Sequence, residues 1–149
     1  MANSSKIKGL HHLAIRAKDF DQTIQFYTEA LDFSVSHTWY LPEFNIRQAA
    51  MLKSSDGNTF IEIFDGQANA PREGRAANEG EEVRTGALLH LAMSVENAKE
   101  AYDRCLNAGA ISCIGPMRLS LGNPPVIVNN SLVYSPNGEV IEFIEDAPF

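Results

Sequence analysis

A short motif occurs twice in this sequence, and the repeat constrains the fold more than any other feature. His-Leu-Ala-Ile begins at His12, and His-Leu-Ala-Met begins at His90, 78 residues further along a chain of 149. Each half also ends in an apolar segment that carries one glutamate, Glu62 or Glu142, and these lie 80 residues apart. This spacing predicts two copies of one supersecondary unit that pack together, because so small a unit cannot bury its apolar face alone.

The first half reads as a strand, a helix and three more strands. Asp19 and Gln22 form a capping pair that predicts the start of the helix. We expect strands over residues 6–17, 33–40, 44–52 and 59–64. In the first of these, alternation places His12 and Arg16 on one face and His11 on the other.

The second half repeats this order. Asn97 and Glu100 form another capping pair, and Gly109 ends the predicted helix. We expect strands over residues 87–95, 111–114, 126–134 and 139–145, with a loop at 119–125. Each module is therefore βαβββ, the first over about residues 7–65 and the second over about 87–146, joined by a polar linker at 66–86. Because neither module can cover both faces of its own sheet, we expect a single domain over residues 1–149.

The composition excludes several classes of function. The net charge of −7 argues against a nucleic-acid partner, because nonspecific binding to nucleic acid needs a basic surface. No apolar run approaches the roughly 20 residues that cross a bilayer, so we expect no membrane association. The first residues lack the apolar core of a signal peptide. Cys105 and Cys113 show no spacing typical of a disulfide or metal pair, which favours a cytoplasmic protein with reduced thiols.

Two histidines and two glutamates occupy equivalent places in the two modules. His12 and His90 lie in the first strands, and Glu62 and Glu142 lie in the last. A carboxylate on an otherwise apolar strand face is costly to bury unless it is paired or bound to a metal. Two imidazoles and two carboxylates suit a first-row divalent ion. Taken singly, each histidine is more often structural and each glutamate more often faces water, so the metal hypothesis depends on the symmetric pattern.

Several motifs in order resemble the vicinal oxygen chelate superfamily, which has the glyoxalase/bleomycin-resistance/dioxygenase fold. They are His-Leu-Ala-Ile-Arg at residues 12–16, Phe-Ile-Glu-Ile-Phe at 60–64, His-Leu-Ala-Met at 90–93 and Ser-Pro-Asn-Gly-Glu-Val-Ile-Glu-Phe at 135–143. The resemblance covers about residues 7–145. It implies an α+β fold in which two tandem βαβββ modules form a half-open mixed β-barrel around a metal cavity.

The resemblance also implies roles for particular residues. The metal ligands of the family fall on His12, Glu62, His90 and Glu142, which would hold one divalent ion per site (nickel, zinc, cobalt, iron or manganese). Two His and two Glu are similar to the ligand set of glyoxalase I, the lactoylglutathione lyase. This implies a metal-dependent lyase or isomerase that converts the thiol adduct of a small 2-oxoaldehyde through a metal-bound enediolate. The catalytic base falls on Glu142 or Glu62, with Glu142 favoured, and Arg16 falls on a substrate-binding position.

Other functions within this fold stay open. One alternative is an epimerase or a ring-cleaving dioxygenase, and another is a metal-free protein that binds a small molecule or confers resistance to it. Extradiol dioxygenases and fosfomycin-resistance thiol transferases typically use two His and one Glu, so a glutamate at position 62 disfavours both. Family members usually dimerise, so we expect a homodimer that acts on a small molecule, with a thiol adduct as the first candidate.

Overall fold

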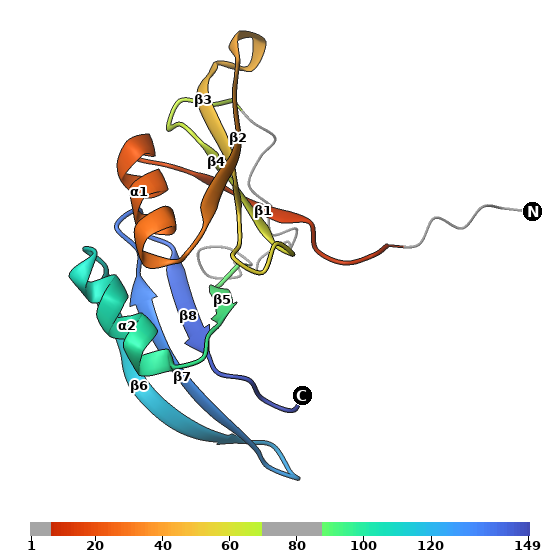
Figure 1. Ribbon diagram of the computed structural model, residues 1–149, viewed down its shortest axis with the longest axis vertical. Helices are drawn as coiled ribbons and strands as arrows, with labels where there is room; N and C mark the ends of the chain where they lie inside the picture. Colours follow the sequence, from red (N-terminus) through yellow and green to blue (C-terminus); the bar gives the residue numbers. More distant parts are fainter. Residues whose placement is uncertain (1–6, 70–87) are drawn as a thin grey trace, which may run out of the picture.

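The computed structural model describes residues 7–69 and 88–149, which form two βαβββ modules in tandem (Figure 1). The first module contains β1 (His12–Arg16), α1 (Phe20–Ala30), β2 (Ser34–Leu41), a short 3-10 helix (Pro42–Phe44), β3 (Ile46–Lys53) and β4 (Phe60–Phe64). The second contains β5 (Leu91–Ser94), α2 (Ala98–Asn107), β6 (Ile111–Leu121), β7 (Val126–Tyr134) and β8 (Val140–Ile144). Most of the predicted linker at 66–86 lies outside the described residues.

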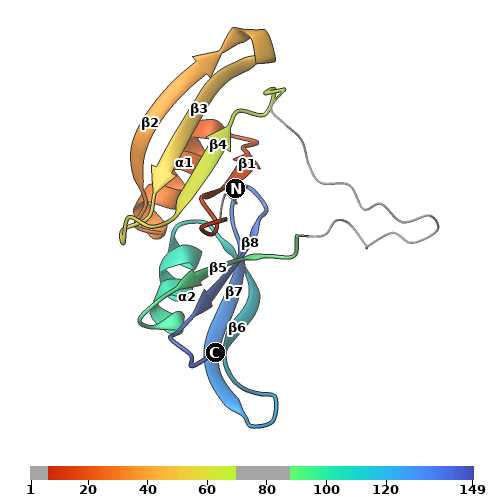
Figure 2. The same ribbon diagram turned by 90° about the vertical axis from the view of Figure 1, so that its right-hand side faces the viewer.

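The strands form two separate four-stranded sheets. Their orders are β1-β4-β3-β2 and β5-β8-β7-β6, so the two modules have the same topology. β1 is parallel to β4 and β5 is parallel to β8, whereas the other neighbours are antiparallel. Figure 2 shows the sheets one beyond the other along the long axis of the molecule. The predicted α+β fold of two mixed, half-open sheets is confirmed.

Both helices begin at the predicted caps. The Asp19 carboxylate accepts a hydrogen bond from the backbone N–H of Gln22 at 3.0 Å, and the Asn97 side chain accepts one from Glu100 at 3.0 Å. These bonds satisfy N–H groups that lack a partner within the helix. Gly109 follows α2 with a φ of +98°, a conformation that favours glycine. Neither described helix is long and apolar enough to cross a bilayer.

The two modules share one hydrophobic core. A single cluster of buried side chains includes Tyr27 and Leu52 from the first module and Val133 and Phe143 from the second. The turn before β8 also joins the modules, because the Asn137 side chain accepts a hydrogen bond from Lys18 N at 2.7 Å and donates one to Arg16 O at 3.0 Å. Packing between α1 and α2 places both helices on the same side of the molecule (Figure 1).

Strand β6 is longer than the sequence predicts. It continues to Leu121, so the first three residues of the loop expected at 119–125 are strand, and only four residues separate β6 from β7. The longer strand contains Gly115 and Pro116, and β6 lies at the edge of its sheet, where proline costs no ladder hydrogen bond on the outer side. The register shifts between Ser112 and Met117 accommodate both residues as irregularities of the strand. The first strands, β1 and β5, are shorter than predicted.

Candidate metal centre

The first module brings His12 and Glu62 together on one face of its sheet. Glu62 pairs with Ala14 across the parallel β1–β4 ladder, so the histidine lies two residues before the partner of the glutamate. The side chains meet at 3.3 Å between His12 Nε2 and Glu62 Oε2. The opposite face carries Leu13 and Ile15, which pack into the core beneath α1. The predicted alternation is therefore confirmed over the residues of β1, His12–Arg16.

The second module repeats the arrangement in the same register. Glu142 pairs with Ala92, again two residues after the histidine, and His90 Nε2 lies 3.1 Å from Glu142 Oε2. The glutamate side chains are largely covered, with 17% of Glu62 and 14% of Glu142 exposed. Each carboxylate therefore lies on a mostly apolar face with one imidazole beside it, where an ionised group needs a counter-charge.

The two pairs do not join within one chain. Across residues 7–69 and 88–149, no three histidine, cysteine, aspartate or glutamate side chains are grouped closely enough to hold a metal ion. The expected convergence of His12, Glu62, His90 and Glu142 on one point is therefore not seen in a single chain. The sheets remain separate because the modules pack through their helices and through the turn at Asn137, and not through facing sheets.

The residues present nevertheless suit a divalent metal. Each pair presents an imidazole nitrogen and a carboxylate oxygen at an edge that is still partly open, with 38% of the His12 side chain and 39% of the His90 side chain exposed. Imidazole and carboxylate are ligands that zinc and other first-row ions accept. The two pairs have matching geometry, with His–Glu distances of 3.3 Å and 3.1 Å.

Arg16 lies on the same strand face as His12 and already has partners. Its Nη2 donates a hydrogen bond to Ala68 O at 3.2 Å, and its carbonyl oxygen accepts one from Asn137. The guanidinium is therefore held beside the end of β4. Its predicted role in substrate binding stays a prediction.

The strand alternation predicted that His11 points away from the candidate site, and this prediction is wrong. Its ring stacks on Phe60 with centroids 5.2 Å apart, and its Nδ1 lies 2.8 Å from the Nδ1 of His12. The reason is that β1 begins at His12, so the strand alternation does not extend to the preceding residue. On the same face, His37 stacks on Trp39 at 5.8 Å, and Trp39 meets Phe64 edge-on at 6.2 Å.

Sequence reasoning missed Asn130, which contacts the second pair. Its Nδ2 donates a hydrogen bond to Glu142 Oε1 at 2.6 Å, and the residue is only 6% exposed. The signal was an amide in the middle of a strand that is otherwise mostly apolar. It became interpretable only with the β7–β8 register, which places Asn130 diagonally from Glu142.

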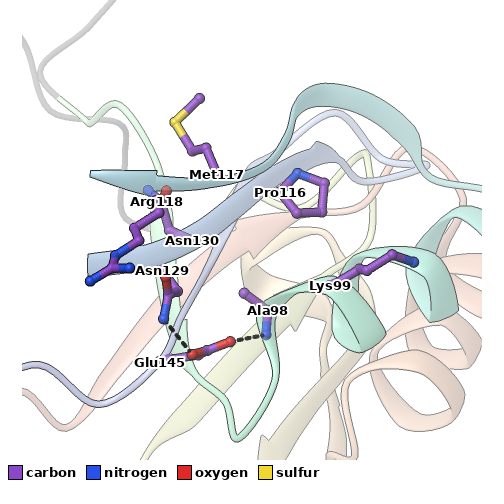
Figure 3. A pocket seen from close by; sticks show the side chains of 8 residues that line it. All are labelled: Ala98, Lys99, Pro116, Met117, Arg118, Asn129, Asn130 and Glu145. Carbon is purple, nitrogen blue, oxygen red and sulfur yellow. Dashed lines mark hydrogen bonds between the residues drawn. The ribbon is translucent and has the colours of Figure 1, made fainter. Parts of the chain in front are cut away.

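A shallow pocket of about 300 Å³ lies at the N-terminal end of α2 (Figure 3). Glu145 occupies this end, where its carboxylate accepts hydrogen bonds from Ala98 N at 3.0 Å and Asn129 Nδ2 at 2.9 Å. The Ala98 bond, followed by that from Asn129, lowers the pKa of Glu145, so a carboxylate already takes the place that an anion would need. The pocket contains neither His–Glu pair and is not the candidate site.

The hairpin of β6 and β7 presents an apolar face beside Glu142. Met117, Leu119 and Leu121 are 38%, 36% and 42% exposed. They pair with Asn130, Val128 and Val126 of β7. These three residues lie on the same face of β7 as Leu132, which pairs with Glu142. Figure 1 shows this hairpin extending away from the rest of the molecule. Exposed apolar side chains gathered on one face are a feature that interaction surfaces share.

Comparison with known proteins gives a family and a fold. The family model described as Glyoxalase/Bleomycin resistance protein/Dioxygenase superfamily matches residues 9–143. The crystal structure of SMU.1112c is similar with a TM-score of 0.66 and 23% identity, covering 94% of this chain and 100% of that chain. A glyoxalase family protein from Enterococcus faecalis has a TM-score of 0.64 and 25% identity, covering 93% of this chain and 98% of that chain.

Glyoxalase I from Zea mays shares the fold more distantly. It has a TM-score of 0.62 and 17% identity, covering 92% of this chain and 44% of that chain, so this chain matches less than half of the maize protein. Among curated proteins the chain has no match.

Proposed function

Because this chain belongs to the Glyoxalase/Bleomycin resistance protein/Dioxygenase superfamily, we propose that it is a metal-dependent lyase or isomerase similar to glyoxalase I. Its substrate in this proposal is the thiol adduct of a small 2-oxoaldehyde. The observation that carries the proposal is the repeated His–Glu pair, at 3.3 Å in the first module and 3.1 Å in the second. A protein that only sequestered an apolar molecule would gain nothing from two carboxylates on apolar faces, where burying a charge is costly.

The active site in this proposal is shared between two chains. His12 and Glu62 of one chain face His90 and Glu142 of the partner subunit, which completes a four-ligand set. Two observations on residues 7–69 and 88–149 support this: the pairs stay apart within one chain, and Met117, Leu119 and Leu121 beside Glu142 are exposed. A two-fold axis would generate two identical sites and cover both exposed faces at once.

The four ligands and their neighbours divide the work of the reaction. A divalent ion, when bound, polarises adjacent carbonyl and hydroxyl oxygens and stabilises the charge that develops on them. One glutamate removes the proton from the carbon that bears the hydroxyl and returns it to the neighbouring carbon. One C–H bond breaks and another forms, so no oxidant or reductant is consumed. Phe60, Phe64 and Trp39 line the Glu62 face and exclude water that would exchange this proton.

Arg16 binds the thiol part of the substrate in this proposal. It lies on the His12 face, and its guanidinium is held at the end of β4 by Ala68 O at 3.2 Å. A planar cation in this place suits a carboxylate on the thiol component, because arginine can form two parallel hydrogen bonds to it.

A subunit-mixing experiment tests the proposal. One variant carries His12→Ala and Glu62→Gln, and the other carries His90→Ala and Glu142→Gln. Each should be inactive alone on the hemithioacetal of methylglyoxal, because each dimer would lack half of both sites. A refolded equal mixture should recover about a quarter of the wild-type activity, since half of the dimers are mixed and half of their sites are intact.

The control is the same refolding with each variant alone. Native mass spectrometry should verify that mixed dimers form. Mixed dimers without any recovered activity would contradict a site shared between chains. Wild-type protein that neither retains a divalent metal nor converts the hemithioacetal, even after reconstitution with zinc, nickel, cobalt, iron or manganese, would refute the enzymatic proposal.

A further inference from the structure

The two halves of the candidate metal centre differ in one hydrogen bond. Asn130 donates to Glu142 Oε1 at 2.6 Å, while Glu142 Oε2 faces His90 at 3.1 Å. Both oxygens of this carboxylate are therefore engaged. In the first module, His12 lies beside Glu62 Oε2 at 3.3 Å, and among residues 7–69 and 88–149 no other donor reaches the Glu62 carboxylate.

The register shows why the first module lacks this donor. Asn130 pairs with Ile144, which lies two residues after Glu142 in β8. In the first module, the residue two positions after Glu62 is Phe64, and its partner is Ala49. Ala49 is therefore the equivalent of Asn130. Alanine has no hydrogen-bond donor in its side chain. The repeat is thus symmetric in its ligands and asymmetric in the residue behind one of them.

Exposure does not explain the difference between the two glutamates. Their side chains are 17% and 14% exposed, so water reaches them to a similar extent. The orientation of the amide follows from chemistry, because an ionised carboxylate only accepts hydrogen bonds and Nδ2 must face it. Asn130 Oδ1 then remains buried, with no partner in the described part of the chain. A buried amide that leaves one of its own atoms unsatisfied adds little to stability, which favours a role toward Glu142.

We propose that Asn130 is a positioning residue that fixes Glu142 as a permanent metal ligand and leaves Glu62 as the ligand that can dissociate. This inference rests on the proposed function and concerns its two carboxylates. A donor behind a metal ligand restricts the rotation of that ligand and raises metal affinity. A general base needs a free oxygen in reach of the substrate proton, and no donor from the described residues occupies Glu62 Oε1. Glu62 is therefore assigned the proton transfer, although the family resemblance favoured Glu142.

Zinc affinity, measured by competition with a chromophoric chelator, tests the assignment without any turnover. Asn130→Ala should weaken zinc binding about 10- to 100-fold, as expected for loss of a donor behind a ligand. Glu142→Gln should weaken zinc binding more than Glu62→Gln does. Combining Asn130→Ala with each of these changes should bring the two glutamine variants closer together, because the donor is the source of the difference.

The neighbouring asparagine provides a matched control. Asn129 lies on the same strand, and its Nδ2 donates at 2.9 Å to Glu145 (Figure 3), which belongs to neither His–Glu pair. Asn129→Ala removes the same kind of Asn–Glu bond and should leave zinc affinity unchanged. Zinc binding weakened equally by Asn129→Ala and Asn130→Ala would reduce the role of Asn130 to general stabilisation and overturn the inference.

Kinetics with saturating zinc test the catalytic part. Glu62→Gln should lower kcat on the hemithioacetal about 10²- to 10⁴-fold, the usual contribution of a general base, while the protein still binds zinc. A larger loss of kcat in zinc-loaded Glu142→Gln would overturn the assignment. Wild-type protein that binds zinc with the expected order of variant affinities but converts no hemithioacetal would refute the proposed substrate and still support the role of Asn130.

Discussion

Asn137 joins the two modules, and its removal should destabilise both of them. The residue lies in the turn before β8, in the second module. Its side chain nevertheless bonds to the first module, to the backbone of Arg16 at the end of β1 and of Lys18 just after it. Asn137→Ala removes the acceptor for Lys18 N and the donor to Arg16 O, together with a hydrogen bond to Glu139 within the same turn, without changing any core side chain.

The expected cost is estimated from the two hydrogen bonds that join the modules, to Lys18 N and Arg16 O. Each neutral hydrogen bond contributes about 1 kcal/mol net, so the loss should lower the free energy of unfolding by about 2 kcal/mol. Part of the loss is recovered by water, because Asn137 is only half-buried. For a chain of this length, 2 kcal/mol corresponds to a fall in Tm of about 4 to 8 °C.

Trp39 makes the assay specific to the first module. It is the only tryptophan in the sequence, it lies in β2, and it packs against Phe64. Urea unfolding should be followed by Trp39 fluorescence and by far-UV circular dichroism, which reports both modules. If the modules fold as one unit, both signals of Asn137→Ala should shift together. Asn107→Ala, an exposed residue at the end of α2 in the same module, is the control and should shift neither signal.

A divided response would refute this reasoning. Suppose that the fluorescence of Asn137→Ala changes at the wild-type urea midpoint, while its circular dichroism shows an earlier or a second transition. The modules would then unfold independently. The shared core around Tyr27 and Phe143 would then contribute too little to couple them.

Two further predictions concern buried titratable groups. Burial acts to raise the pKa of Asp65, but backbone donors from Gln48, Gln67 and Arg47 lower it more, so its ionised form stabilises the fold. Asp65→Asn should therefore cost about 1 to 3 kcal/mol of unfolding free energy at pH 7, and this difference should shrink as pH falls below about 4, through the lowered pKa. A pH-independent difference would contradict this reasoning. Burial raises the pKa of Cys105 to about 11, so the native thiol should resist iodoacetamide at pH 8 until the protein unfolds. The rate of alkylation should be measured by mass spectrometry. Alkylation of native Cys105 as fast as in urea would contradict this prediction.

Several elements of the fold were predictable because their signals are local. Asp19 and Asn97 cap helices through bonds to residues three positions later, so the sequence contains both partners of each bond. The length of β6 was not predictable in this way. Gly115 and Pro116 indicate a strand end when read locally, and only the position of β6 at the sheet edge makes them compatible with a longer strand.

The candidate site divides along the same line. The sequence by itself determined that His12, Glu62, His90 and Glu142 occupy equivalent places in two modules, because the repeated motifs are local. The pairing of each histidine with its glutamate needed the parallel β1–β4 and β5–β8 ladders. Tertiary structure alone decided that the pairs stay apart within a chain and that Asn130 reaches only one glutamate. The physical reason is that module packing and strand register depend on long-range contacts between faces. Both modules carry the same local sequence signals because of the repeat. Whether a side chain such as Ala49 or Asn130 can contact a glutamate depends on the strand register, which the local sequence does not set.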